Sequence, residues 1–455
     1  MSRSFRPAIF ALGFFLISLS AAVALASAPS GRADTSSVAP AAISGAPGYV
    51  SVRLRPLKGV VSVSGSDILI GSISRPGFSK IKIQFEKLKA KEEWSIFEVA
   101  SDSSGGSDLG KKIATVLGRK VDIRGSGLRV DLRPSPAHVQ LVVKGPRSPI
   151  QLVGFLDLES YLEGVVASEV PRDWPMEALK AQAVAARSFT LARVRERMSA
   201  ASTQRSGKSV DWLLESSVID QVFDFDRKHS RASEAVRATR GEVLTDSSRR
   251  PMKAHYHADC GGRVDLPHEV WTSAGDGSSA RGSDGGVAEY GAIIDRGCAV
   301  STRNSWRFVT TRADLSRELR RKQLVPSGFE VASLSVVTRT SGGRAEFLQA
   351  RSVEGREVRF SGERLRAALG YSEIRSTLFD VVSGVAPSDS GEAARPVTVE
   401  IVGRGFGHGA GLCQWGSRQL ASDGKTYREI LSHYYPKSKI EQLQKSSEQN
   451  LARSN

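Results

Sequence analysis

One glutamate stands out among the residues that could do chemistry, because it lies in an otherwise apolar stretch. Glu169 belongs to the segment Val165–Pro171, whose other members are valine, alanine, serine and proline. Apolar surroundings raise the pKa of a carboxyl group and suit it to protonate a leaving oxygen, as glycosidic cleavage requires. A buried carboxylate can equally be half of a salt bridge, here with Arg187. The stretch predicts a partly desolvated carboxyl at the end of a strand or turn.

Hydrolytic glycosidases generally need a second carboxylate, which acts as base or nucleophile. The candidates for this role are Asp173, Asp224 and Asp226. Each of them can equally be a surface or loop residue, and Asp173 can serve only to start the helix that follows it.

A glycine run from Gly403 to Gly411 has a glycine at every second position. It partly matches the fingerprint of a dinucleotide-binding loop, which must open a βαβ unit with an acidic residue ~20 positions later. No second strand–helix pair follows Gly411, so we set nucleotide binding aside. The glycines instead predict a backbone that approaches a ligand or a neighbouring segment closely. His408 within the run can hydrogen-bond a sugar, orient the acid or serve as a structural histidine.

The cysteines leave several interpretations open. Cys413 lies near His408 and His433 but lacks a local protease signature, which favours a small buried cysteine over a nucleophile. A candidate metal set, in which alternate residues would share one strand face, consists of His255, His257, Cys260 and His268. A Cys260–Cys298 disulfide with Cys413 free competes with this set, as do three reduced thiols.

Other residues also have two interpretations. The aromatic residues that can either stack on sugar faces or pack in the core are Trp174, Trp415, Tyr434 and Tyr435. The charge run from Arg317 to Lys322 predicts a solvated helix face.

The composition narrows the class of protein. The chain has 455 residues, 64 Lys+Arg against 48 Asp+Glu and a formal net charge of +16. Hydrophobic residues make up 40% and charged residues 25%, as in globular proteins, and only three cysteines exclude a disulfide-dense scaffold. The basic excess is compatible with nucleic acid, an anionic membrane or an anionic cell-wall polymer as partner.

The N-terminal residues predict export. Arg3 and Arg6 precede a mostly apolar run from Ala8 to Leu25 and a small-residue stretch that ends at Ala28. This pattern predicts a signal peptide over residues 1–28, with an uncleaved anchor helix as the alternative. We therefore expect a secreted or periplasmic protein of the cell envelope, with no nucleic-acid partner and no stable membrane span after cleavage. Residues 29–48 are rich in alanine, serine and proline, which predicts a flexible spacer.

The elements that must position the candidate residues follow a mixed α+β pattern. Alternation with period two from Tyr49 to about Phe155 predicts antiparallel strands. Pro175 and the alanine-rich segment after it predict a central helix. We expect a β-rich part over 49–155, a catalytic core with a mixed second lobe over 156–437, and a polar tail over 438–455.

Two further elements are expected near the C-terminal end. Residues 397–401 predict a strand before the glycine run. Thr426 and Glu429 form a capping-box pattern for a last helix, which Pro436 should terminate.

Two long segments closely resemble a known family. They run from Tyr161 to Phe189 and from Gly403 to Gly416, and shorter pieces agree at 221–223, 254–262, 364–370, 376–379 and 430–436. Together they resemble the stage II sporulation protein D (SpoIID/LytB) family of peptidoglycan lytic transglycosylases. The likeness covers roughly Tyr49 to Lys437, so it implies one SpoIID-like catalytic unit.

The resemblance implies an activity and a site. Members of this family cut glycan between N-acetylmuramic acid and N-acetylglucosamine, form a 1,6-anhydro end without water, and prefer strands stripped of stem peptides. Glu169 takes the position of the catalytic acid/base. The resemblance further implies that the substrate cleft is lined by Gln182, Arg187, His408 and Gln414.

The resemblance also bears on cofactors and alternatives. Some members carry a zinc site of histidines and cysteines shortly before the segment that matches Gln221–Phe223. Residues 199–220 contain neither residue type, so we expect no metal and no other cofactor. The expected partner is the peptidoglycan glycan strand. The competing hypothesis is a non-catalytic cell-wall binding protein or amidase enhancer, a role that relatives of this family also have.

Overall fold

The structure is a computed structural model that describes residues 49–71, 73–74, 79–88, 91–99, 109–145, 148–203, 210–271, 292–299, 305–383 and 397–443. The predicted signal peptide and spacer, and the predicted tail beyond residue 443, lie outside these described residues. Among the helices that are described, none combines the length and the apolar character needed to span a bilayer. The fold is mixed α+β, as the sequence predicted.

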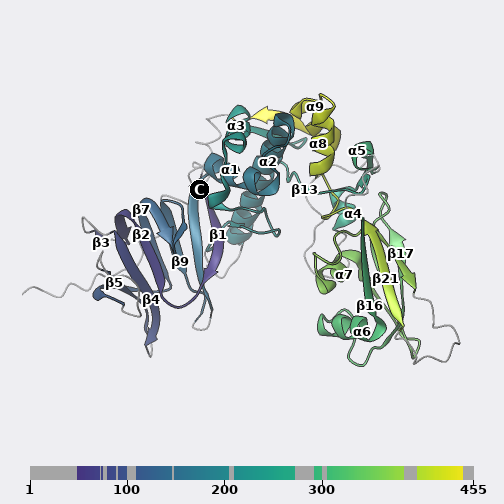
Figure 1. Ribbon diagram of the computed structural model, residues 1–455, viewed down its shortest axis with the longest axis horizontal. Coiled ribbons are helices and arrows are strands. Elements are labelled where there is room, and N and C mark those ends of the chain that lie inside the picture. Colours follow the sequence, from purple (N-terminus) through teal and green to yellow (C-terminus); the bar gives the residue numbers. More distant parts are fainter. Residues whose placement is uncertain are drawn as a thin grey trace, which may run out of the picture. The chain divides into compact units, whose positions relative to one another are not determined.

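The N-terminal part is one large sheet (Figure 1). Its strands are β1 (Tyr49–Leu57), β2 (Val61–Ile70), β3 (Ile73–Ser74), β4 (Lys80–Leu88), β5 (Lys91–Glu98), β6 (Lys111–Leu117), β7 (Lys120–Val130), β8 (Arg133–Pro134), β9 (His138–Val142), β10 (Ile150–Asp157) and β11 (Leu214–Glu215). The strand order is β11-β1-β10-β9-β7-β2-β4-β5-β6, with β3 beside β2 and β8 beside β7. The pairings among β1–β10 are antiparallel, which confirms the prediction from the alternating sequence, and β11 joins β1 in parallel.

Alternation in the sequence sets the register of this sheet. Val61 lies opposite Ile83 and Val63 opposite Ile81, and all four side chains are buried. Because successive side chains of a strand point to opposite faces, the apolar residues collect on one face and form the core there.

Four helical elements follow the sheet: α1 (Leu158–Glu169), α2 (Met176–Thr203), the short 3₁₀ helix η1 (Phe225–Arg227) and α3 (Ser230–Ala238). Strand β10 runs directly into α1, whose first turn is capped by the Asp157 side chain, which accepts from the Ser160 amide. Glu169 is therefore the last residue of a helix, and the expectation of a strand or turn was wrong. Helix α1 stops there because Pro171 disfavours helical backbone at Val170.

Helix α2 begins directly after Pro175, as predicted, and lies against α1, α3, α8 and α9. Its buried alanines include Ala181, Ala183, Ala185 and Ala186. Small side chains let the neighbouring helices approach closely, so α2 is the central element of this part.

Two three-stranded sheets and two helices lie within residues 305–404. Their members are β16 (Ser305–Thr311), β20 (Phe379–Ser383) and β21 (Thr398–Arg404), then β17 (Val331–Arg339), β18 (Ala345–Ser352) and β19 (Glu357–Ser361), with α6 (Arg312–Arg321) and α7 (Gly362–Leu369). One apolar cluster joins them, with Trp306, Leu315, Phe329 and Phe360 among its buried members. Strand β21 includes the predicted strand before the glycine run.

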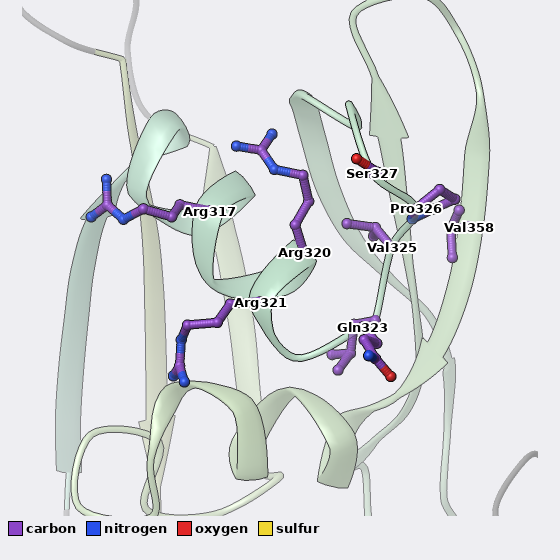
Figure 2. A pocket seen from close by; sticks show the side chains of 9 residues that line it. Arg317, Arg320, Arg321, Gln323, Val325, Pro326, Ser327 and Val358 are labelled. Atoms are coloured by element: carbon purple, nitrogen blue, oxygen red, sulfur yellow. The ribbon is translucent and has the colours of Figure 1, made fainter.

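The predicted charge run lies on α6 with its arginines solvated. Arg317 pairs with Asp314 and Arg321 with Glu318, one turn apart on the helix. Figure 2 shows Arg317, Arg320 and Arg321 beside an open hollow, which Val325 and Pro326 also line. None of the predicted site residues lines this hollow.

The remaining elements are short and link distant segments. They are β12 (Glu242–Thr245) with β23 (Lys439–Gln442), β13 (Tyr256–His257) with β22 (Leu412–Cys413), β14 (Arg263–Val264) with β15 (Ile293–Ile294), and the helices α4 (Pro267–Val270), α5 (Arg296–Ala299), α8 (Gln414–Ser422) and α9 (Tyr427–Tyr434). Helix α9 has the predicted capping box of Thr426 and Glu429. The start of the predicted tail contains β23, which pairs with β12 and places the partly buried Ile440 opposite the buried Leu244.

Candidate active site

Three neutral donors surround the carboxyl of Glu169 at the end of α1. The Val222 amide donates to Oε1 at 2.8 Å, and the Tyr256 hydroxyl donates to the same oxygen at 3.3 Å. The Gln414 side chain donates from Nε2 to Oε2 at 3.2 Å. In the part of the chain that the structure describes, no basic side chain forms an ion pair with Glu169.

The surroundings of Glu169 favour its protonated form. Burial raises the pKa of Glu169, and the hydrogen bonds from Val222, Gln414 and Tyr256 oppose this rise only in part. The pKa of Tyr256 lies well above its usual value, first because of burial and then because of the nearby Glu169 carboxyl. Tyr256 therefore remains a hydrogen-bond donor. Glu169 as a residue is partly exposed to solvent.

Gln414 connects Glu169 to α2. It is the first residue of α8, and its Nε2 lies 3.5 Å from Oε1 of Gln182 as well as 3.2 Å from Glu169. Both glutamines are almost fully buried. The structure therefore brings one predicted residue, Gln414, to Glu169, and a second, Gln182, to Gln414.

The loop that carries Val222 is fixed by buried polar contacts. The Gln221 side chain accepts from the Tyr161 hydroxyl at 3.1 Å and from Thr190 Oγ1 at 3.0 Å, and it donates to the Ala186 carbonyl at 3.0 Å. Because these partners lie on α1 and α2, the Val222 amide is held at a set position relative to Glu169.

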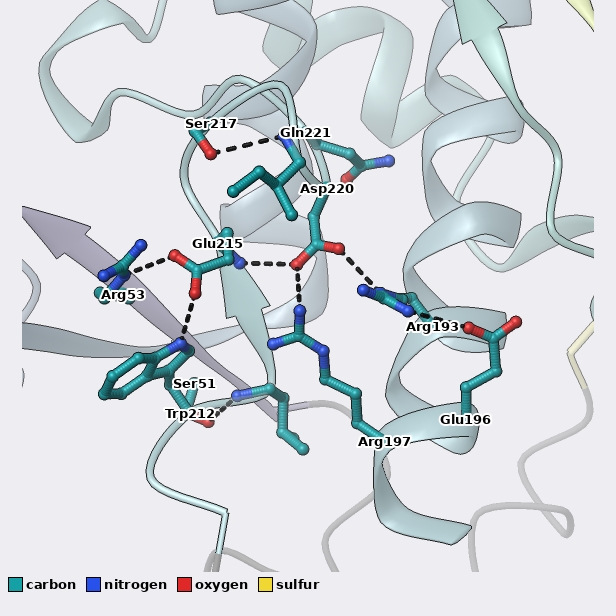
Figure 3. A network of polar contacts seen from close by, with 12 residues as sticks. Ser51, Arg53, Arg193, Glu196, Arg197, Trp212, Glu215, Ser217, Asp220 and Gln221 are labelled. Carbon is teal, nitrogen blue, oxygen red and sulfur yellow. Dashed lines mark hydrogen bonds and ion pairs between the residues drawn. The ribbon is translucent and has the colours of Figure 1, made fainter. Parts of the chain in front are cut away.

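Asp220, which precedes Gln221 in the loop that carries Val222, also fixes this loop through contacts of its carboxylate (Figure 3). Its carboxylate accepts from Arg193 at 2.8 Å, from Arg197 at 3.1 Å and from the Glu215 amide at 2.8 Å. The Asp220 side chain is fully buried, so its two arginine partners compensate its charge.

The glycine run packs against the segment around β13. Asp259 and Phe406 exchange two backbone hydrogen bonds of 2.9 and 2.8 Å. A Cβ atom on Gly411, which has a φ of +70°, would lie 2.0 Å from the His255 carbonyl oxygen. The run therefore needs glycine for close approach to a neighbouring segment, as expected, and it leads into β22 and α8 rather than into a βαβ unit.

His408 lies among other rings rather than on Glu169. Its ring centroid is 4.9 Å from that of Trp271, 5.8 Å from that of His255 and 5.5 Å from that of His257. Burial and the adjacent His257 lower the pKa of His408 well below its usual value, and burial lowers the pKa of His255 to about 3. His408 is therefore neutral, and its Nδ1 accepts from the Ala410 amide at 3.1 Å.

Arg187, which the resemblance assigned to the substrate cleft, forms a buried ion pair and is not among the described partners of Glu169. Its guanidinium is fully buried and forms a bidentate ion pair with Glu159, at 2.9 and 2.7 Å. It also donates to the carbonyls of Glu242 and Val236. These contacts join the start of α1 to α2, α3 and β12, and they exclude the alternative of an Arg187–Glu169 salt bridge.

Two family models match the chain, and they cover different regions. Residues 147–245 match the SpoIID model, described as a stage II sporulation protein, and residues 295–411 match a domain of unknown function (DUF8618). The chain carries a SpoIID domain. This domain contains α1, α2 and the loop with Val222, but Tyr256 and Gln414 lie outside both matched ranges.

Curated relatives are similar over a longer stretch than the SpoIID domain. The stage II sporulation protein D of Bacillus amyloliquefaciens is 26% identical over 328 residues, which is 68% of this chain and 80% of that protein. An uncharacterised protein of Brachyspira hyodysenteriae is 26% identical over 62% of this chain and 66% of its own length. The amidase enhancer of Bacillus subtilis is 26% identical over 60% of this chain, but only 39% of that protein is covered.

Other candidate residues near the SpoIID domain are placed as follows. Asp173 and Asp226 are exposed, and the Asp224 carboxylate caps η1 by accepting from the Asp226 amide. Of the candidate sugar-stacking aromatics, Trp415 is partly exposed, and the ones that are buried in the core are Trp174, Tyr434 and Tyr435.

The cysteines of the chain are free thiols that lie together. Cys260, Cys298 and Cys413 are all buried, and Cys298 Sγ lies 3.3 Å from Cys413 Sγ. A Cys260–Cys298 disulfide with Cys413 apart is therefore not what the structure contains. The set of His255, His257, Cys260 and His268 is not formed either, because Cys260 faces the other two cysteines and Asp295.

Sequence reasoning missed two of the three donors to Glu169. Tyr256 was inside the piece 254–262 that carries the family resemblance, and an aromatic hydroxyl there was the available signal. Nothing in the sequence could have identified the Val222 amide, because the position of a backbone donor depends on the path of the chain and not on the residue type.

Proposed function

We propose that this protein is a lytic transglycosylase that cleaves peptidoglycan glycan between N-acetylmuramic acid and N-acetylglucosamine. Glu169 is the catalytic acid/base in this proposal, and the expected substrate is a strand that has been stripped of peptides or otherwise modified. The observation that carries the proposal is the environment of Glu169, whose carboxyl has a raised pKa and neutral donors in a residue that is partly exposed.

The proposed reaction needs one carboxyl and no water. Protonated Glu169 gives its proton to the glycosidic oxygen as the bond from the anomeric carbon to that oxygen breaks. The resulting carboxylate then accepts the proton of the sugar's own 6-hydroxyl, whose oxygen forms the new bond to the anomeric carbon. Glu169 ends protonated again, and the products are a 1,6-anhydro end and a free 4-hydroxyl.

The donors around Glu169 fit both halves of this cycle. Tyr256 and Gln414 are neutral, so they stabilise the carboxylate intermediate without trapping it as a permanent ion pair. A fixed cation there would lower the pKa and remove the acid. The described contacts of the Glu169 carboxyl include no second carboxylate, which agrees with a one-carboxyl mechanism.

The SpoIID domain and the relatives support a role at the cell wall. The net charge of +16 becomes +14 once Arg3 and Arg6 are removed with the signal peptide, and it would attract the protein to an anionic wall over long range and less strongly in high salt. A secreted or periplasmic location and the division into signal peptide, spacer and catalytic region remain parts of this proposal.

Cleavage of purified glycan strands by wild type and Glu169→Gln tests the proposal. We expect wild type to release fragments with anhydro-muramic ends, identified by mass, and Glu169→Gln to release essentially none. The matched control is Glu163→Gln on the same helix, where Glu163 lies 3.7 Å from Lys228. This control should retain cleavage.

Two outcomes would overturn the proposal. Equal fragment release by wild type and Glu169→Gln removes Glu169 from the chemistry, and reducing ends without anhydro-muramic acid remove the transglycosylase mechanism. If folded wild type binds glycan but releases no fragments, the alternative of a wall-binding protein or amidase enhancer is favoured.

A further inference from the structure

Three cysteines and one aspartate from separate parts of the chain meet in the core. Cys260 follows β13, Cys298 lies in α5, Cys413 ends β22, and Asp295 comes directly before α5. All four side chains are buried, with at most 2% of any residue exposed. One ligand atom from each lies within 4.8 Å of the others. We call these four residues the Cys₃Asp cluster.

The spacing in the Cys₃Asp cluster suits a small tetrahedral ion. The Sγ atoms of Cys298 and Cys413 are 3.3 Å apart, and Cys260 Sγ lies 3.4 Å from Asp295 Oδ2. Zinc–sulfur bonds of about 2.3 Å at tetrahedral angles place the ligand sulfurs roughly 3.8 Å apart. Small side-chain adjustments would therefore place all four atoms around one ion.

The groups around the cluster are those expected around thiolate ligands. Cys413 Sγ accepts from the amides of Cys260 and Gly416, each at 3.3 Å, and Cys260 Sγ accepts from the Gly262 amide at 3.3 Å. Backbone amides that point at sulfur stabilise its anionic form and tune a bound metal.

The carboxylate of Asp295 is oriented but not neutralised. Tyr434 donates its hydroxyl to Oδ2 at 2.8 Å, and the Cys298 amide donates to Oδ1 at 3.2 Å. Among the described residues, no lysine, arginine or histidine forms an ion pair with Asp295. Gly416 makes room for this arrangement, because a Cβ atom there would lie 2.1 Å from both Asp295 Oδ2 and the Tyr434 hydroxyl.

We propose that the Cys₃Asp cluster binds one structural Zn²⁺ ion through Cys260, Cys298, Cys413 and Asp295. Thiolates favour zinc over harder cations, and four protein ligands close the site as in structural zinc centres. A disulfide between two of the cysteines would leave the third thiol and the buried carboxylate without compensation, whereas zinc engages all four groups.

The zinc ion would also fix the surroundings of Glu169. Strand β13 carries Tyr256 and pairs with β22, which ends at Cys413, and the next residue is Gln414. Tyr256 and Gln414 are two of the donors to Glu169. The four ligands thus act as positioning residues, because they join the segments that deliver these two donors.

The metal content of the purified full chain tests this proposal without any activity assay. We expect one zinc per chain by mass spectrometry of the metals, and release of that zinc on treatment with a mercurial thiol reagent. Replacement by Co²⁺ should give the intense visible absorption of a tetrahedral cobalt–thiolate centre. Thiol titration of the denatured, metal-free chain should find three free cysteines.

Conservative variants separate ligands from neighbours. Asp295→Asn and Cys298→Ser should lose the zinc, and Tyr434→Phe, which removes only the hydroxyl that orients Asp295, should weaken zinc binding by about 10–100-fold. The matched control is Ser417→Ala. Ser417 is buried in α8, and its hydroxyl donates to the Cys413 carbonyl rather than to a sulfur or carboxylate atom. This variant should keep its zinc.

Several outcomes would overturn the proposal. One is a folded chain without metal that also takes up no Zn²⁺ or Co²⁺ after reduction, and another is a Cys298–Cys413 disulfide in the native protein. A third is a full zinc content in both single variants, Asp295→Asn and Cys298→Ser. Glu169→Gln should keep zinc while losing cleavage, so a failure here and a failure of the proposed activity can be told apart.

Discussion

The two ends of helix α1 each carry a glutamate, and the two glutamates have different partners. Near its start, Glu159 forms a bidentate ion pair with the fully buried Arg187. At its last residue, Glu169 contacts an amide, a hydroxyl and a carboxamide, and none of these carries a charge. The same residue type on the same helix is therefore ion-paired with an arginine at one end and surrounded by neutral donors, with a raised pKa, at the other.

This contrast shows that two glutamates of one helix can have very different partners. Burial raises the pKa of a carboxyl, but a nearby guanidinium opposes that rise and keeps the charge. The identity of the donors decides the outcome, and these donors come from segments far away in sequence. Changes at Glu169, at Glu159 or at their direct partners test this contrast.

The largest effect is expected from removing the two carboxylates in turn. Glu169→Gln should lower turnover on glycan strands by about 10²–10⁴-fold, the usual contribution of a general acid. Glu159→Gln should lose stability but retain turnover per folded molecule. Steady-state kinetics and thermal unfolding of both variants give the comparison, which fails if the two variants lose turnover equally.

The next largest effect concerns the ion pair. Arg187→Met should lower the free energy of unfolding by about 3 kcal/mol, because it leaves a largely buried carboxylate unpaired. Denaturant unfolding measures this change. The double variant Glu159→Gln/Arg187→Met should recover part of the loss, since no unpaired charge remains. A double variant that is less stable than Arg187→Met would contradict this account.

A smaller effect is expected from removing one of the hydrogen-bond donors to Glu169. Tyr256→Phe removes a hydrogen bond that favours the carboxylate, so the pKa of Glu169 should rise further. The alkaline limb of the pH–rate profile should move to higher pH, while turnover changes by less than about tenfold. The control is Tyr427→Phe, whose hydroxyl donates to Glu242 instead. A shift to lower pH would show that Tyr256 does not act through Glu169.

The smallest effect is a pH dependence of stability. Because burial raises the pKa of Glu169 in the folded state, the folded protein keeps a proton that the unfolded chain has already released. Stability of the wild type should therefore fall as pH rises from the unfolded pKa through the folded one. Glu169→Gln has no carboxyl to titrate and lacks this pH-dependent loss of stability. At a pH above the folded-state pKa of Glu169, its Tm should therefore exceed that of the wild type by a few degrees at most. Identical pH profiles for the two proteins would contradict the raised pKa.

Local patterns in the sequence predicted the regular elements well. Alternation from Tyr49 onward gave the antiparallel strands, Pro175 marked the start of α2, and Thr426 with Glu429 marked the start of α9. These signals work because strand faces and helix caps depend on residues that are close in sequence. The end of α1 was misassigned, since the apolar run before Glu169 fits a strand as well as a buried helix.

The sequence alone determined which residues are available to do chemistry: an isolated glutamate in an apolar segment, a glycine run with Gln414 beyond it, and three cysteines. Only the tertiary structure decided how they are used. It paired Arg187 with Glu159, brought Tyr256 and Gln414 to Glu169, and gathered the cysteines around Asp295. The physical reason is that pKa values and ligand sets depend on atoms within a few ångströms, and in this fold those atoms come from segments up to 245 residues apart.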